Sequence, residues 1–121
     1  MSLKTFITEF YTSDALYNPE TMERFLHEEV QLEWYSSKGF LTKNRTELLQ
    51  LAADLSKAYE TSHVAIHDVI EEESKVSVRY THHASTIENP NQFVILAHFM
   101  VHWEILDGKL FHGWQMSQLP T

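Results

Sequence analysis

The alternation of apolar and polar residues in the last third of the chain predicts two long β-strands. From residue 93 to residue 105 every odd position is apolar, whereas the even positions include two histidines and a glutamate. Apolar residues at every second position line one face of a strand. The strand would turn at Asp107-Gly108, and a second strand would follow. A strand of this length indicates a curved sheet that wraps around a helix or a ligand.

The first sixty residues show helical spacing instead. Apolar residues at positions 3, 6, 7, 10 and 11 predict an amphipathic helix. Asn18-Pro19 predicts the start of a second, short helix. A third helix, the longest, is predicted from Asn44 to about Tyr59, because Asn44 and Glu47 have capping-box spacing. Between the second and third helices, the alternation of apolar and polar residues predicts a short strand over residues 30–35, followed by a loop over residues 36–39.

From residue 62 onward the apolar period changes from helical to strand-like. Strands are predicted at about residues 62–72, 75–86, 93–107 and 109–118, joined by tight turns at 73–74 and 107–108 and a looser turn at 89–91. The order of elements predicts an α+β fold in which helices pack on one face of an antiparallel sheet. We expect residues 1–121 to form one domain.

Charge and cysteine content exclude several classes of function. Nine basic and seventeen acidic residues give a net charge of −8, which would repel phosphate backbones and anionic lipids. We therefore expect no binding of nucleic acid or membranes. The absence of cysteine excludes disulfides and thiol nucleophiles, and it favours a reducing, cytoplasmic location. With three glycines and no phosphate-binding loop, nucleophile elbow or HExxH motif, we expect no cofactor.

Four short segments and a tryptophan resemble a known superfamily. The segments are Phe25-Leu26-His27-Glu28-Glu29-Val30, Asn44-Arg45-Thr46-Glu47-Leu48, Lys75-Val76-Ser77-Val78-Arg79-Tyr80 and Asp107-Gly108-Lys109-Leu110, which Trp114 follows. In their order along the chain, they resemble the nuclear transport factor 2-like superfamily, and more closely its SnoaL-like, polyketide-cyclase-related branch. The resemblance implies a cone-shaped fold with three N-terminal helices packed in a strongly curved, mainly antiparallel sheet. It also implies an open cavity and a homodimer formed through the outer face of the sheet.

The superfamily that the chain resembles includes isomerases, cyclases, dehydratases and epoxide hydrolases, and also non-catalytic binding modules. The aspartate base of ketosteroid isomerase, a distant member, aligns with Trp34, and the neighbouring Glu33 should point to the other face of its strand. Cyclases of this branch carry an aspartate four residues beyond the last tryptophan, where this chain has Gln118. An amide cannot act as a general acid or base. The resemblance therefore implies neither the isomerase reaction nor the cyclase reaction for this chain.

Strand alternation predicts which residues face the inside of the cone. The predicted inward residues are Val76, Val78, Tyr80, His82, Phe99, Val101, Trp103, Leu110, His112, Trp114 and Met116. Within this set, Tyr80, Trp103 and Trp114, together with Tyr11 and Trp34, would line an aromatic cavity that suits a small, flat apolar or aromatic ligand. The alternative is that these rings simply fill the cone as a hydrophobic core.

His82 and His112 are the candidate catalytic residues, because both are predicted to face inward and imidazole titrates near neutral pH. They would act as a base in a cofactor-free isomerisation, cyclisation or dehydration, with Tyr11 or Tyr80 donating a hydrogen bond to a developing oxyanion. The alternative is that each is a hydrogen-bonded core histidine.

The histidine pairs 63/67 and 98/102 have the spacing of helical zinc ligands, but they lie on predicted strands. Four strand residues span about 13 Å, which is too far for one ion, so we expect no metal there. A site across neighbouring strands, such as His82 with His98, remains an alternative.

The outward face of the longest predicted strand is too apolar for open solvent. It carries Leu96, His98, Met100 and His102. Exposed apolar sheet surface usually meets a partner, so we expect a symmetric dimer at this face. If its histidines are buried and neutral, the dimer should weaken below about pH 6.5. The sequence thus leaves three alternatives: a cofactor-free enzyme, a non-catalytic ligand-binding protein, and a protein-interaction module that uses the outer face.

Overall fold

The computed structural model describes residues 2–120. The helical elements are α1 (Leu3–Thr12), the 3-10 turn η1 (Ala15–Tyr17), α2 (Pro19–Glu23) and α3 (Arg45–Ala58). The strands are β1 (Leu26–Ser36), β2 (Gly39–Asn44), β3 (Thr61–Glu72), β4 (Lys75–Ser85), β5 (Phe93–Leu106) and β6 (Lys109–Gln118).

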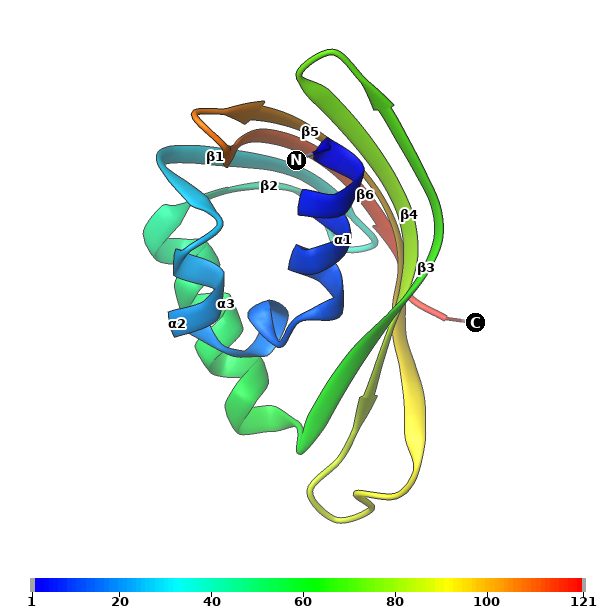
Figure 1. Ribbon diagram of the computed structural model, residues 1–121. Helices are drawn as coiled ribbons and strands as arrows, with labels where there is room; N and C mark the ends of the chain where they lie inside the picture. The colour runs from blue at the N-terminus through cyan, green and yellow to red at the C-terminus, as the bar shows by residue number, and fades with distance from the viewer. Residues whose placement is uncertain (1, 121) are drawn as a thin grey trace.

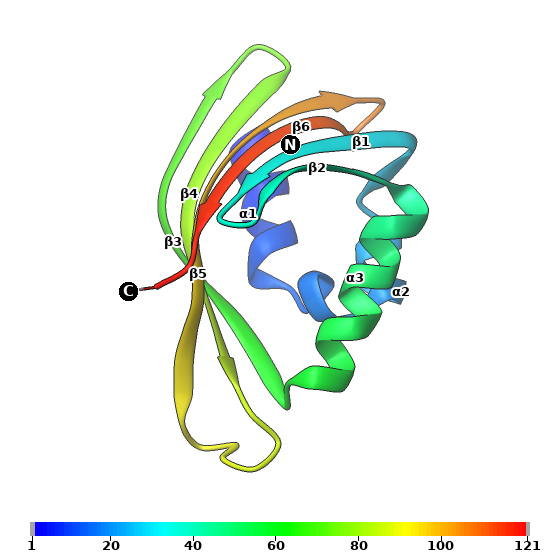
Figure 2. The same cartoon turned by 180° about the vertical axis from the view of Figure 1, so that it is seen from behind.

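The six strands form one curved sheet in the order β2-β1-β6-β5-β4-β3. The β1–β6 pair is parallel and the other pairs are antiparallel. Figure 1 shows the helices on the concave side of the sheet, and in Figure 2 α3 lies across the open side, opposite the sheet. The predicted α+β cone with a strongly curved, mainly antiparallel sheet is therefore confirmed.

Local sequence signals begin two of the helices where they were predicted. Asn18 caps α2, with Pro19 in the first turn. At the start of α3, the Asn44 side chain accepts a hydrogen bond from the Glu47 backbone and the Glu47 side chain accepts one from the Asn44 backbone. This reciprocal pair satisfies two backbone N–H groups that the first helical turn leaves free.

One strand was missed, and another was predicted too short. Strand β1 begins at Leu26 rather than at residue 30, and residues 39–44 form β2, which pairs with β1 as a hairpin. The expected loop is reduced to a tight turn in which Gly39 has a φ of 116°, a conformation open mainly to glycine. Strand β2 has little apolar alternation because it is an edge strand and most of its residues are exposed.

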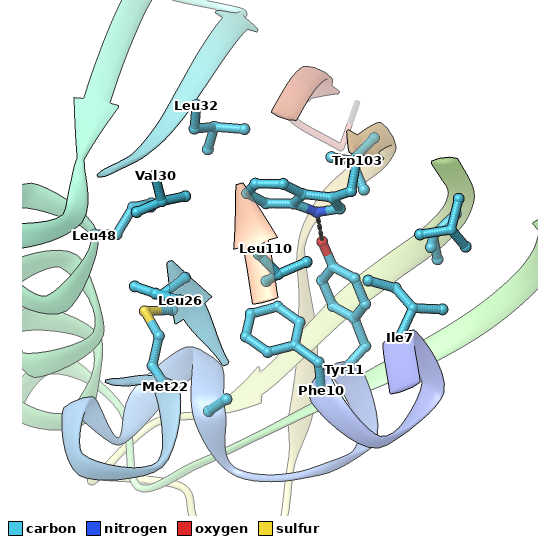
Figure 3. Close-up of a cluster of buried hydrophobic side chains, with 14 of the residues drawn as sticks. Ile7, Phe10, Tyr11, Met22, Leu26, Val30, Leu32, Leu48, Trp103 and Leu110 are labelled. Atoms are coloured by element: carbon cyan, nitrogen blue, oxygen red, sulfur yellow. Dashed lines mark hydrogen bonds between the residues drawn. The ribbon is translucent and has the colours of Figure 1, made fainter. Parts of the chain in front are cut away.

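The core lies where α1 packs against the concave face of the sheet. Figure 3 shows Trp103 and Tyr11 at its centre, joined by a hydrogen bond, with Phe10 and Leu110 beside them. Each of these four side chains is at most 3% exposed. The core therefore fixes α1 against strands β5 and β6.

Three strands each contain one extra residue relative to their neighbour. The extra residues are His67 in β3, Leu96 in β5 and Phe111 in β6. Such a β-bulge bends a strand, and it also reverses which side chains face inward on either side of it. The bulges therefore decide which residues reach the inside of the cone.

Candidate functional site

A cavity of about 350 Å³ lies between the helices and the concave face of the sheet. Most of its wall is apolar and comes from α1, α3 and the inward side chains of β1, β4 and β5. The wall includes Phe10, Met22, Leu32, Leu41, Leu48, Leu51, Leu55, Ala97 and Phe99. The volume falls in the range of small-molecule pockets, so the cone is not filled solid by its own side chains.

Four of the five aromatic residues predicted to line the cavity lie along it. Tyr11, Trp34, Tyr80 and Trp103 border the empty volume. Tyr80 also stacks on Phe99, with ring centroids 4.8 Å apart and planes 9° from parallel. Trp34, Tyr80 and Trp103 provide flat apolar surfaces on the sheet side of the cavity, and Tyr11 provides one from α1.

Hydrogen bonds hold two of these rings in place. The Trp103 Nε1–H donates to the Tyr11 hydroxyl at 2.9 Å, and the Trp34 Nε1–H donates to the Ser117 hydroxyl at 2.8 Å. Burial raises the pKa of Tyr11 above its ordinary value, and the hydrogen bond from Trp103 opposes that rise only in part. Burial also raises the pKa of Tyr80, as does the neighbouring Tyr11. Both phenols therefore stay protonated at neutral pH and can donate hydrogen bonds, but cannot act as bases.

His82 borders the cavity from β4 and is 5% exposed. Its Nε2 lies 2.9 Å from the Ser62 hydroxyl on β3. Burial, together with repulsion from His83 and His63, lowers the pKa of His82 to about 4. At neutral pH the ring is therefore uncharged and can offer a lone pair.

The prediction that His112, Trp114 and Met116 face the cone is wrong. Phe111 is an extra residue in β6, so the inward positions after it are Gly113, Gln115 and Ser117. Trp114 and Met116 are 36% and 64% exposed and line a groove on the outer face of the sheet. Neither His112 nor Trp114 can contact a ligand in the cavity.

On the outer face, His112 takes part in an interaction that the sequence did not suggest. Its Nε2 lies 2.7 Å from a carboxylate oxygen of Glu33 on β1, and its ring stacks on Trp114 with centroids 4.2 Å apart. The prediction that Glu33 points away from the cone is confirmed by this contact. The pair and the stacked ring join β1 to β6 on the convex side.

The second correction concerns Leu96, which was predicted on the outer face. It is the extra residue of β5, and its side chain lines the cavity instead. His98 and Met100 lie on the outer face as expected, and Met100 is 61% exposed. His102 is also on this face, where its Nδ1 lies 2.7 Å from the Ser77 hydroxyl.

Gln115 is one of the polar cavity residues that the sequence analysis missed; the others are Ser36, Ser37, Lys38 and Ser117. Gln115 is 6% exposed and lines the cavity from β6. Strict alternation assigned it to the outer face. Gly113 was the available signal, because a glycine within a strand often marks a bulge or a close approach.

Within residues 2–120, no group of three or more histidine or acidic side chains is arranged to hold a metal ion. His82 and His98 lie on opposite faces of the sheet, so the alternative cross-strand site is not formed. Nor is any helix in the described range long and apolar enough to cross a membrane.

A model of the SnoaL-like domain matches residues 7–112 of the chain, which is most of its length. The chain belongs to the SnoaL-like family. This finding confirms the resemblance drawn from the short sequence segments, and it agrees with the cone described above. Among curated protein sequences, no significant match is found.

Solved structures with the SnoaL-like fold superpose on most of the chain at low sequence identity. IdmH from Streptomyces antibioticus, provisionally assigned as a polyketide cyclase, has 12% identity and a TM-score of 0.74, covering 97% of this chain and 92% of its own. BvnE pinacolase from Penicillium brevicompactum has 16% identity and a TM-score of 0.74, with coverages of 96% and 88%.

A de novo designed protein with a curved β-sheet also superposes, with 17% identity, a TM-score of 0.63 and coverages of 99% and 88%. Since natural enzymes and a designed protein share this architecture, the similarity shows the fold alone. The function of this SnoaL-like domain must be argued from its own cavity.

Proposed function

We propose that this SnoaL-like domain binds a small apolar or aromatic molecule in its cone. The observation that carries the proposal is the cavity of about 350 Å³, which is walled by leucines and aromatic rings and contains few polar groups. Burial of an apolar ligand against such walls is favourable at about 25 cal/mol per Å². Polyketide cyclase and pinacolase relatives with the same fold are compatible with such a ligand.

A fluorescent apolar probe tests this proposal. N-phenylnaphthylamine should bind the wild-type protein, and Leu51→Trp should weaken binding at least tenfold, because Leu51 lines the cavity from α3. Leu49→Trp is the matched control: Leu49 lies on the same helix and is also partly buried, but it packs on the core outside the cavity. Equal affinity of both variants and the wild type would contradict binding in the cone.

We further propose cofactor-free proton transfer, with His82 as the base, as a second function of the same cavity. The neutral imidazole of His82 and the protonated phenols of Tyr11 and Tyr80 all border the empty volume. A base that takes a proton next to a carbonyl, with a phenol that donates to the developing oxyanion, is the minimum set for isomerisation or cyclisation.

Deuterium exchange at the carbon next to the carbonyl of a bound ketone tests this second function. With β-tetralone in heavy water, the wild-type protein should accelerate exchange. His82→Gln should abolish the acceleration while keeping affinity for the ketone within a few-fold, since the amide can still reach Ser62. Exchange by His82→Gln at the wild-type rate would leave only the binding function.

We also propose that two copies of the chain associate through the convex face of the sheet. Exposed apolar side chains gather there around a groove of about 430 Å³ lined by Tyr35, Ile70, Met100, Trp114 and Met116. In this proposal the cavity binds the ligand and the convex face serves only for association. The third alternative, a pure interaction module, would need the convex face but not the cavity.

A further inference from the structure

The side chain of Gln115 is a polar group directed into an otherwise apolar part of the cavity. On β6 it lies opposite Val101 of β5 and beside Trp34 of β1. Cross-strand partners share a face of the sheet, and Val101 is a buried core residue of the concave face. Gln115 therefore faces inward between two apolar neighbours, and it is 6% exposed.

Several other polar side chains along the cavity already have partners within the protein. Trp34 donates to Ser117, Trp103 donates to Tyr11, and the Nε2 of His82 pairs with Ser62. In the part of the chain that the structure describes, no side-chain hydrogen bond involves the Gln115 amide, and its polar atoms are not among the fully buried side-chain atoms without a partner, so they are open to the cavity. An amide offers two N–H donors and an acceptor oxygen, and leaving these unpaired in an apolar site is costly. The arrangement favours a ligand that supplies the missing partner.

We propose that Gln115 is a specificity-determining residue, which binds an uncharged carbonyl or hydroxyl group on an otherwise apolar ligand. This inference rests on the ligand-binding function proposed above. The Nε2–H₂ group can donate to a carbonyl or hydroxyl oxygen, and the Oε1 atom can accept from a hydroxyl. A carboxylate is disfavoured beside Gln115, because the amide carries no compensating charge and His82 is neutral, whereas Lys38, a charged side chain of the cavity wall, is exposed in the turn between β1 and β2.

Two ligands that share a two-ring skeleton and differ by one carbonyl test the proposal. Isothermal titration of the wild-type protein should give about tenfold tighter binding of β-tetralone than of tetralin, the size expected for one buried hydrogen bond. In Gln115→Leu the ratio should fall to about one, with tetralin affinity kept or improved. Gln118→Leu is the matched control, because Gln118 carries the same amide on the same strand but is exposed and does not line the cavity, so the ratio should stay near the wild-type value.

The possible outcomes separate this inference from the function on which it rests. If neither molecule binds the wild-type protein, the binding function itself fails. If both bind and Gln115→Leu keeps the preference for the ketone, the role of Gln115 is wrong.

A second measurement uses only the wild-type protein and so does not depend on whether a variant folds. In isotope-labelled wild-type protein, the side-chain NH₂ signals of Gln115 should shift on saturation with β-tetralone and much less with tetralin. Equal shifts with both ligands, or no shift with the ketone, would overturn the proposal.

Discussion

At the scale of single residues, His82 links the stability of the fold to pH. Burial lowers its pKa from 6.5 to about 4 in the folded protein, whereas the unfolded chain restores the ordinary value. Between these two pH values the unfolded state binds more protons than the folded state. The stabilisation is therefore fully present above about pH 6.5 and is lost as the pH falls toward 4.

We predict that the free energy of unfolding falls by about 3 kcal/mol through His82 between pH 7 and pH 4. Urea denaturation at a series of pH values should show this loss in the wild-type protein. His82→Gln should show a smaller loss, because it keeps a polar group near Ser62 but cannot be protonated. Parallel pH profiles for the two proteins would refute the assignment. The neighbouring His83 also has a lowered pKa and contributes to both profiles.

At the scale of the elements, strand alternation predicted the site well only where no bulge intervenes. Strand β4 has no extra residue, and its predicted inward residues Val76, Val78 and Tyr80 are all buried. In β5 the prediction is correct from Ala97 onward and wrong at Leu96. The extra residue Phe111 reverses the whole remainder of β6.

The physical reason is that a bulge changes pairing without changing hydrophobicity. Beyond Phe111 the large apolar residues Trp114 and Met116 lie on the convex face, whereas Gly113, Gln115 and Ser117 face the cavity, so the apolar pattern of β6 indicated the wrong face. The helix caps, in contrast, depend on residues close together in the sequence and were predicted correctly. Long-range partners such as Glu33 with His112, which are 79 residues apart, leave no local signal.

Gly113 fixes the close packing of β6 against the core. A Cβ atom at this position would come within 2.7 Å of the six-membered ring of Trp103 and 2.8 Å of a methyl group of Leu32. We predict that Gly113→Ala destabilises the fold by about 1–3 kcal/mol, because the indole must move while it is held by Tyr11. Chemical denaturation measures the loss.

A double-mutant cycle with Trp103→Phe provides the control for this prediction. The smaller ring removes part of the clash, so Gly113→Ala should cost less in the Trp103→Phe background than in the wild type. An equal loss of stability in both backgrounds would show that the strain does not arise from the contact with Trp103.

At the scale of the whole molecule, the distribution of charge favours contact through the convex face. The chain carries a net charge of −8, so two copies repel each other over most of their surface. The groove on the convex face contains one acidic residue, Asp68, and its carboxylate is paired with Arg79 at 2.7 Å. Apolar side chains make up much of the remaining surface there. Association at this face therefore brings little like charge together at neutral pH.

Protonation of the histidines on the convex face should instead favour separate monomers. The ionisable groups on the convex face include His63, His67, Asp68 and Glu72 of β3, Lys75, Arg79 and His83 of β4, His98, His102 and Glu104 of β5, His112 of β6 and Glu33 of β1. Burial lowers the pKa of His83, and repulsion from His63, His98 and His67 lowers it further. A dimer that buries these rings binds fewer protons than two monomers, so acid favours the monomers.

We predict a dimer at about pH 8 that dissociates as the pH falls below about 6.5, measured by light scattering after size-exclusion chromatography. Met100→Glu should abolish the dimer at pH 8, because it places a carboxylate in the apolar groove. Ile87→Glu is the matched control: Ile87 is similarly exposed, at 58% against 61%, but it lies in the loop between β4 and β5. A dimer fraction that stays constant from pH 8 to pH 5 would show that the histidines are not buried by association. Loss of the dimer in both variants alike would mean that added charge, rather than the convex face, controls the assembly.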